Sequence, residues 1–171
     1  MLLLKTLSRS AGFITVAALS AVSSNADEAQ MHAIAQAVSA EQIEANITTL
    51  ANFGTRHTLS DTKSNTRGIG AARRWIEAEF NSISQKCGGC LEVFTVSGIV
   101  SGTDRMPDPV EIVNVIAILR GSLDPNRFTL MSGDIDSRIS DPMNFVSDSP
   151  GANDNASGLA GVIEAARVLS Q

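Results

Sequence analysis

The sequence predicts an α/β fold in which helices flank a mostly parallel or mixed sheet. Helical spacing of apolar residues appears early, in segment 28–53, and again at the end, in segment 157–169. Between them lie runs of β-branched residues that are nearly apolar on both faces, which is typical of strands covered by helices on both sides. A chain of 171 residues with 43% hydrophobic residues is long enough to bury one core.

Residues 1–26 differ from the rest and are predicted to be a signal peptide. Two basic residues precede the short apolar run 11–19, and the small residues Ser24 and Ala26 then predict cleavage before Asp27. The apolar run is too short to cross a bilayer of roughly 30 Å, although an uncleaved anchor is the alternative. We therefore expect a secreted or periplasmic protein without stable membrane association after cleavage.

The charge pattern argues against nucleic acid as a partner. The formal net charge is -5, and Arg73-Arg74 is the only basic cluster. Nucleic-acid binding normally requires a basic patch, so this class of function is excluded. Nothing in the pattern indicates the oligomeric state.

Two helices are predicted at the start of the mature chain, over 28–38 and 40–53. Ser39 and Gln42 form a capping box between them, and the second helix is expected to end at Gly54. A polar loop, 55–65, follows.

A third helix is expected after this loop, with Thr66 as its cap. Trp75 lies close to its apolar face, so core packing is its expected role. The apolar stripe consists of Ile69, Ala72, Ile76, Phe80 and Ile83.

Three strands are predicted, over 91–96, 112–119 and 127–132, with a turn at 121–126. The final helix, 157–169, ends two residues before the last residue. Three strands do not complete such a sheet, so the fold is expected to be incomplete at the C-terminus. The stripe of the final helix consists of Leu159, Val162, Ile163, Ala166 and Leu169.

Cys87 and Cys90 form a CxxC pair that follows a predicted helix. In an exported protein such a pair favours a structural disulfide. A redox pair would be expected at the start of a helix, and a zinc knuckle needs a second pair that the sequence lacks.

Carboxylates gather after the third predicted strand. Asp134 and Asp136 follow that strand directly, and Asp154 lies in the Gly-rich turn 151–158 that opens the final helix. Ligands of α/β sheets bind beyond the carboxyl ends of strands, so the three aspartates could hold a metal ion. Spacing alone equally fits ordinary capping and turn residues.

The residues themselves carry a resemblance. The strings SGDIDS at 132–137 and PGANDNASG at 150–158 resemble the metal-binding half-site of the co-catalytic zinc aminopeptidases, metallopeptidase family 28. The likeness extends upstream to 114–117 and 55–57. It implies a sheet of the zinc exopeptidase type, with residues 27–171 as the N-terminal part of the catalytic domain.

The resemblance also implies roles for the aspartates. Asp154 would bridge two zinc ions, and Asp136 would be the catalytic-site residue that orients the first ligand. Asp134 stands where the family has a histidine; a carboxylate can bind zinc but lowers the net charge of the site. His32 and His57, the only histidines, are weak ligand candidates.

The function implied is an exported, zinc-dependent exopeptidase of aminopeptidase type with two zinc ions and a peptide substrate. The family's paired glutamates and later ligands would lie downstream, so the 171-residue chain is expected to be an inactive part of such an enzyme. Two rivals remain: a non-catalytic relative, suggested by Asp134, and a thiol-disulfide protein built on Cys87 and Cys90.

Overall fold

A computed structural model describes residues 27–124 and 126–171, so the predicted signal peptide, 1–26, lies outside the described residues. The chain forms two units, Met1–Val38 and Ser39–Gln171. In the described part of the first unit, residues 27–36 are helical, as their periodicity predicts. Within the described ranges, every helix is too short or too polar to cross a membrane.

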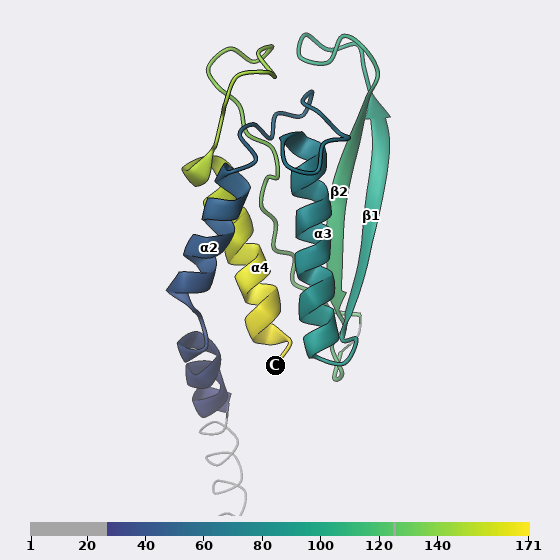
Figure 1. Cartoon of the computed structure of the whole chain (residues 1–171). Coiled ribbons are helices and arrows are strands. Elements are labelled where there is room, and N and C mark those ends of the chain that lie inside the picture. Colours follow the sequence, from purple (N-terminus) through teal and green to yellow (C-terminus); the bar gives the residue numbers. More distant parts are fainter. Residues whose placement is uncertain (1–26, 125) are drawn as a thin grey trace, which may run out of the picture. The chain divides into compact units, whose positions relative to one another are not determined.

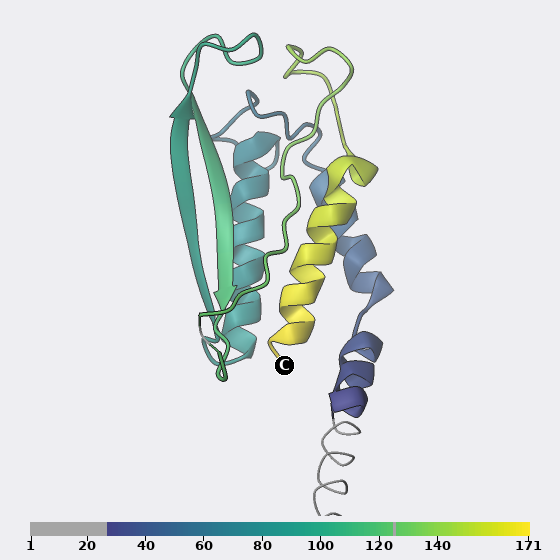
Figure 2. The ribbon, with the colours of Figure 1, turned by 180° about the vertical axis from the view of Figure 1, so that it is seen from behind.

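The second unit contains three helices and a hairpin (Figure 1). Helix α4 lies between α2 and α3, and α3 packs against both strands of the hairpin (Figures 1 and 2). The elements are α2 (Ala40–Ala51), α3 (Gly68–Lys86), β1 (Leu91–Val100), β2 (Val110–Leu119), the wide turn η1 (Ala152–Ala156) and α4 (Ser157–Leu169).

The core lies between these helices and the base of the hairpin. Trp75 packs against it, as predicted, with its ring centroid 6.4 Å from that of Phe53. The buried cluster consists of Leu50, Ile76, Phe80, Ile83, Leu91, Ala156, Leu159 and Ile163.

The mixture of helix and strand is confirmed, but the described sheet is smaller than predicted. It consists of β1 and β2, antiparallel from Leu91 opposite Leu119 to Val100 opposite Val110. The strand predicted at 127–132 is wrong, because this segment pairs with no other described strand. Its apolar side chains reflect strand propensity, but a strand also needs a neighbour for its backbone hydrogen bonds.

The start of α2 is capped by Ser39, as predicted, because the Ser39 hydroxyl accepts from the Gln42 amide at 3.1 Å. The second half of the capping box is wrong. The Ser39 amide donates instead to Glu164 Oε1, 2.6 Å away on α4. One capping residue therefore also ties α2 to α4.

Helix α3 is not capped by Thr66. Its N-cap is Arg67, whose side chain makes no capping bond, and the helix begins at Gly68. Instead, the Ser60 hydroxyl accepts from the Ile69 amide at 2.9 Å. The preceding loop folds back to supply the cap, which residue order near the helix start did not indicate.

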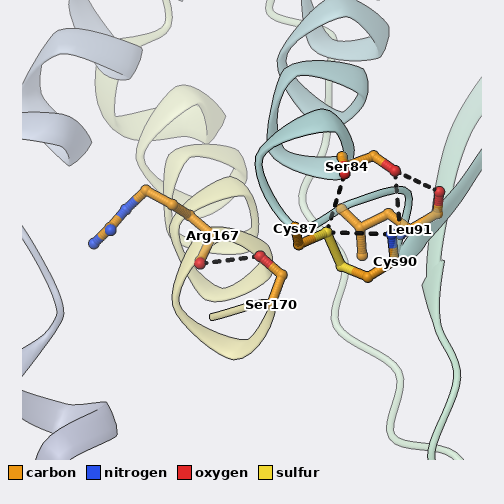
Figure 3. Close-up of a disulfide and its surroundings, with 6 residues drawn as sticks. All are labelled: Ser84, Cys87, Cys90, Leu91, Arg167 and Ser170. Carbon is orange, nitrogen blue, oxygen red and sulfur yellow. Dashed lines mark hydrogen bonds between the residues drawn. A yellow bond between two sulfur atoms is a disulfide. The ribbon is translucent and has the colours of Figure 1, made fainter.

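The cysteines form the predicted disulfide, Cys87–Cys90, between the end of α3 and the start of β1 (Figure 3). Beside it, the Ser84 hydroxyl donates to the Leu91 carbonyl at 2.8 Å and accepts from the Leu91 amide at 3.2 Å. The disulfide and these hydrogen bonds hold the turn from helix to strand.

Helix α4 has the predicted bounds, but its buried face is shifted. Val168 is buried, whereas Leu169, predicted in the stripe, is 50% exposed. Glu164 is also buried, and its carboxylate accepts from Arg167 Nε at 2.8 Å. This bond, with that from Ser39, supplies the partners that a buried charge requires.

Candidate functional site

Two acidic turns carry the aspartates: the first is segment 132–137 and the second is segment 150–158. The segment Gly54 to His57 connects these two turns through its backbone. On one side, the Ser137 amide donates to the Arg56 carbonyl at 3.3 Å. On the other, Thr55 pairs in parallel with Ser149, whose amide donates to the Gly54 carbonyl at 2.8 Å. Segments about 80 and 90 residues downstream are therefore held by the same short stretch of chain.

Buried hydroxyls reinforce this connection. The Ser137 hydroxyl accepts from the Arg56 amide at 3.0 Å and donates to the Ser149 carbonyl at 2.6 Å. The hydroxyls of Thr55 and Ser149 lie 3.0 Å apart. Because all three hydroxyl residues are buried and bonded, the base of the two turns is a satisfied polar network.

The Arg56 side chain crosses the same region and is 1% exposed. Its guanidinium donates only to carbonyl oxygens, from Nε at 2.9 Å, from Nη1 at 2.8 and 2.6 Å, and from Nη2 at 3.1 Å. The acceptors are, in that order, Ile135, Leu50, Pro150 and Gly151. Burial lowers the pKa of Arg56, and the negative charge of Asp136 opposes this shift.

The first acidic turn passes close to the start of α4. A Cβ atom on Gly133 would lie 2.7 Å from the Leu159 amide nitrogen, so only glycine fits there. Asp134 and Asp136 follow with exposed side chains, and Asp136 Oδ2 accepts from the Thr58 hydroxyl at 2.9 Å. The predicted orienting residue is thus itself held by a residue of the loop after Arg56.

The second acidic turn begins at Gly151, whose positive φ of 49° favours glycine. Asp154 is exposed within η1 and has non-helical angles (φ -118°, ψ 94°), and the Asp154-Asn155 peptide bond is cis. The Ala156 amide closes the turn on the Gly151 carbonyl at 3.1 Å. Asp154 therefore projects from an irregular turn that leads into α4, not from a regular helical cap.

His57 offers no free imidazole to the acidic turns. His57 is buried, its Nδ1 accepts from the Leu59 amide at 3.0 Å, and its Nε2 lies 3.1 Å from the Pro142 carbonyl. Both ring nitrogens are therefore engaged by backbone. His32 is exposed on the helix of the first unit.

The donor set fits zinc in kind but not in number. Carboxylate oxygens can bind zinc, and the side chains of Asp134 and Asp154 make no hydrogen bond to a described residue. However, the described ranges hold no group of three or more His, Cys, Asp or Glu side chains placed to bind a metal ion. Zinc sites take three or four protein ligands, so these residues could supply only part of one.

Comparison with known proteins shows which family this part of the chain resembles. The sequence profile of peptidase family M28 matches residues 114–171, which run from β2 through both acidic turns to the end of α4. A probable zinc metalloprotease of Pyrenophora teres f. teres (strain 0-1) is 51% identical over 142 residues, 83% of this chain. The chain belongs to peptidase family M28. The match to the family profile thus includes the segment that carries all three aspartates.

Other relatives in this family support the assignment. A probable zinc metalloprotease of Leptosphaeria maculans is 47% identical over 146 residues, and one of Pyrenophora tritici-repentis is 48% identical over 142 residues. These alignments cover 85% and 83% of this chain but only 34% and 29% of the relatives, and the Pyrenophora teres alignment covers 29%. The chain therefore spans about a third of the length of these curated relatives. No solved structure matches it.

Arg56, Ser137 and Ser149 lie in no sequence pattern that predicts their roles. A weak signal was present, because Ser137 is the last residue of the first acidic string and Ser149 immediately precedes the second. Their function as hydrogen-bond partners depends on segment 54–57 lying between them, which spacing along the chain does not reveal.

Proposed function

We propose that this chain contributes part of the active site of a zinc-dependent exopeptidase that releases amino-terminal residues from peptides. The observation that carries the proposal is the joining of the two acidic turns. Both lie in the family-matched segment, and segment 54–57 bonds to residues beside each of them.

In this proposal Asp134 and Asp154 would hold the zinc, with Asp154 as the ligand shared between two ions. Asp136 orients the first ligand, and its bond from Thr58 limits its own rotation. Zinc bound there would supply a Lewis acid and an activated water. Because the chain spans about a third of its relatives, the remaining ligands and the general base belong to sequence outside these 171 residues.

We further propose that the protein is exported. The basic, apolar and small residues of segment 1–26 support this, and so does the disulfide, since such bonds persist mainly in oxidising compartments. The net charge of -5 favours a peptide rather than a nucleic acid as the partner.

A chimaera tests the proposed activity. Residues 39–171 would replace the matching segment of the Pyrenophora teres relative, whose own zinc-dependent hydrolysis of an aminoacyl-p-nitroanilide is measured first. We expect the chimaera to release p-nitroaniline and to lose this activity with a chelator. Asp154→Asn should lower kcat/KM by more than roughly 100-fold, because even partners of metal ligands cost 10- to 100-fold. Asp108→Asn, in the exposed hairpin loop, makes the same charge change as a control.

One observation favours a second candidate, a non-catalytic relative. Asp134 places a carboxylate where the family resemblance expects an imidazole, which lowers the net charge of the site. A folded chimaera that is inactive but gains activity and zinc on Asp134→His would favour this candidate. A folded chimaera that stays inactive with either residue, while the unaltered relative is active, would contradict the proposed peptidase.

A further inference from the structure

We propose that Arg56 is a positioning residue that holds the two acidic turns at a set separation. Its importance for zinc binding rests on the function proposed above, but its role in positioning rests on the described contacts alone. Arg56 touches neither Asp134 nor Asp154 through a hydrogen bond, and acts through the backbone beside them.

The first step concerns which carbonyls Arg56 binds. Nε donates to the carbonyl of Ile135, the residue between Asp134 and Asp136. On the other side, Nη1 and Nη2 donate to Pro150 and Gly151, which open the turn that carries Asp154. One planar group therefore binds both turns, and its fixed geometry sets the distance between them.

The second step concerns burial. The Arg56 side chain is 1% exposed, so water cannot replace its bonds without opening the core. All four side-chain bonds go to carbonyl oxygens, and no carboxylate pairs directly with the guanidinium among the described residues. A buried cation that no carboxylate contacts through a hydrogen bond is costly, even with the charge of Asp136 nearby, and its bonds to two separate turns give a reason for its placement.

The third step concerns the backbone. Arg56 also bonds to the first turn through its own peptide group, since its amide donates to the Ser137 hydroxyl and its carbonyl accepts from the Ser137 amide. Main chain and side chain together give one residue three attachments to the first turn and two to the second. Lysine keeps the charge, but a single ammonium cannot reproduce the separate directions of three guanidinium nitrogens.

NMR on residues 27–171 without metal tests the proposal directly. In the unaltered chain we expect an NOE between Gly133 Hα and the Leu159 amide, and slow exchange of the Ser137 and Ser149 amides. In Arg56→Met the NOE should weaken, and both amides should exchange roughly tenfold faster or more. The reason is that the turns lose their hydrogen bonds from the charged guanidinium, and one such bond changes the equilibrium between closed and open turn by more than about tenfold. Arg56→Lys should fall between the two.

Ile163→Val is the matched control, because it opens a small cavity in the core and removes none of the hydrogen bonds that hold the two turns. It should lower the unfolding midpoint while the NOE and the two amide exchange rates relative to global unfolding stay as in the unaltered chain. If Arg56→Met is folded and keeps the NOE and both protections, the positioning role is refuted. If Arg56→Met is unfolded, the comparison of Arg56→Lys with Ile163→Val decides by the same criteria.

A second arm uses Mn²⁺, which broadens amide signals near its binding site, as a probe of the same samples. If both turns bind the same Mn²⁺ ion, the signals at residues 134–136 and 153–155 should broaden at the same Mn²⁺ concentration in the unaltered chain. In Arg56→Lys the two sets of signals should broaden at different Mn²⁺ concentrations. Equal broadening in both would count against the positioning role. If the unaltered chain shows no broadening at either turn but the metal-free results hold, the positioning role stands, and the chimaera with its full set of ligands decides the metal-site proposal.

Discussion

The close approach of Gly133 to α4 leads to a quantitative prediction for Gly133→Ala. The added Cβ would lie 2.7 Å from both the nitrogen and the Cα of Leu159, and 3.0 Å from the Gly158 carbonyl carbon. Ordinary contact begins at 3.4 Å, so the backbones must separate by about 0.7 Å, the difference between 3.4 and 2.7 Å. Such overpacking costs about 1 to 3 kcal/mol of unfolding free energy.

Gly161→Ala makes the same chemical change in the interior of α4, where an added Cβ meets nothing within 4 Å. There alanine should stabilise the chain by about 0.8 to 1 kcal/mol, because glycine is the poorer helix former. The two variants should therefore differ by about 2 to 4 kcal/mol. Urea unfolding followed by circular dichroism at 222 nm measures the difference. A Gly133→Ala chain as stable as Gly161→Ala would refute the described packing of the first acidic turn against α4.

Three further predictions concern stability. Replacing Cys87 and Cys90 together by serine should lower the unfolding free energy by about 2 kcal/mol, the loop-closure value for a four-residue loop; dithiothreitol should destabilise the unaltered chain equally and the double variant not at all. Ser39→Ala should cost about 1 kcal/mol by removing the cap of α2, seen as a lower urea midpoint. The hydrogen bond from Arg167 lowers the pKa of Glu164, so this group adds stability above its unfolded pKa near 4.5, and the contribution is lost as pH falls through the lower folded value. Glu164→Gln should therefore flatten the pH dependence of unfolding below about pH 5, and an unchanged slope would contradict that assignment.

Local patterns were sufficient to predict several elements. The bounds of α4, the cap of α2 by Ser39 and the Cys87–Cys90 disulfide all depend on residues close together in the chain. Helical periodicity, capping and a three-residue spacing between cysteines are local properties, so sequence alone can reveal them. The strings around Asp134 and Asp154 likewise identified the family, because they are contiguous.

Other features depended on contacts between distant segments. Segment 127–132 has residues typical of a strand, but a strand must pair with a neighbouring strand. No described strand pairs with this segment, and the local sequence does not reveal this. The cap of α3 by Ser60 and the bond from Ser39 to Glu164 also join parts of the chain that sequence order separates.

The sequence by itself determined the family, the acidic turns and the bounds of α4, because these follow from contiguous strings and from the helical period. Only the tertiary structure decided how the turns are held together. In the sequence Arg56 is one of several polar residues in a predicted loop, and nothing near it indicates its partners. In the structure its guanidinium binds carbonyls 79, 94 and 95 residues away. Such long-range bonds form only when the folded core brings those carbonyls around a buried cation.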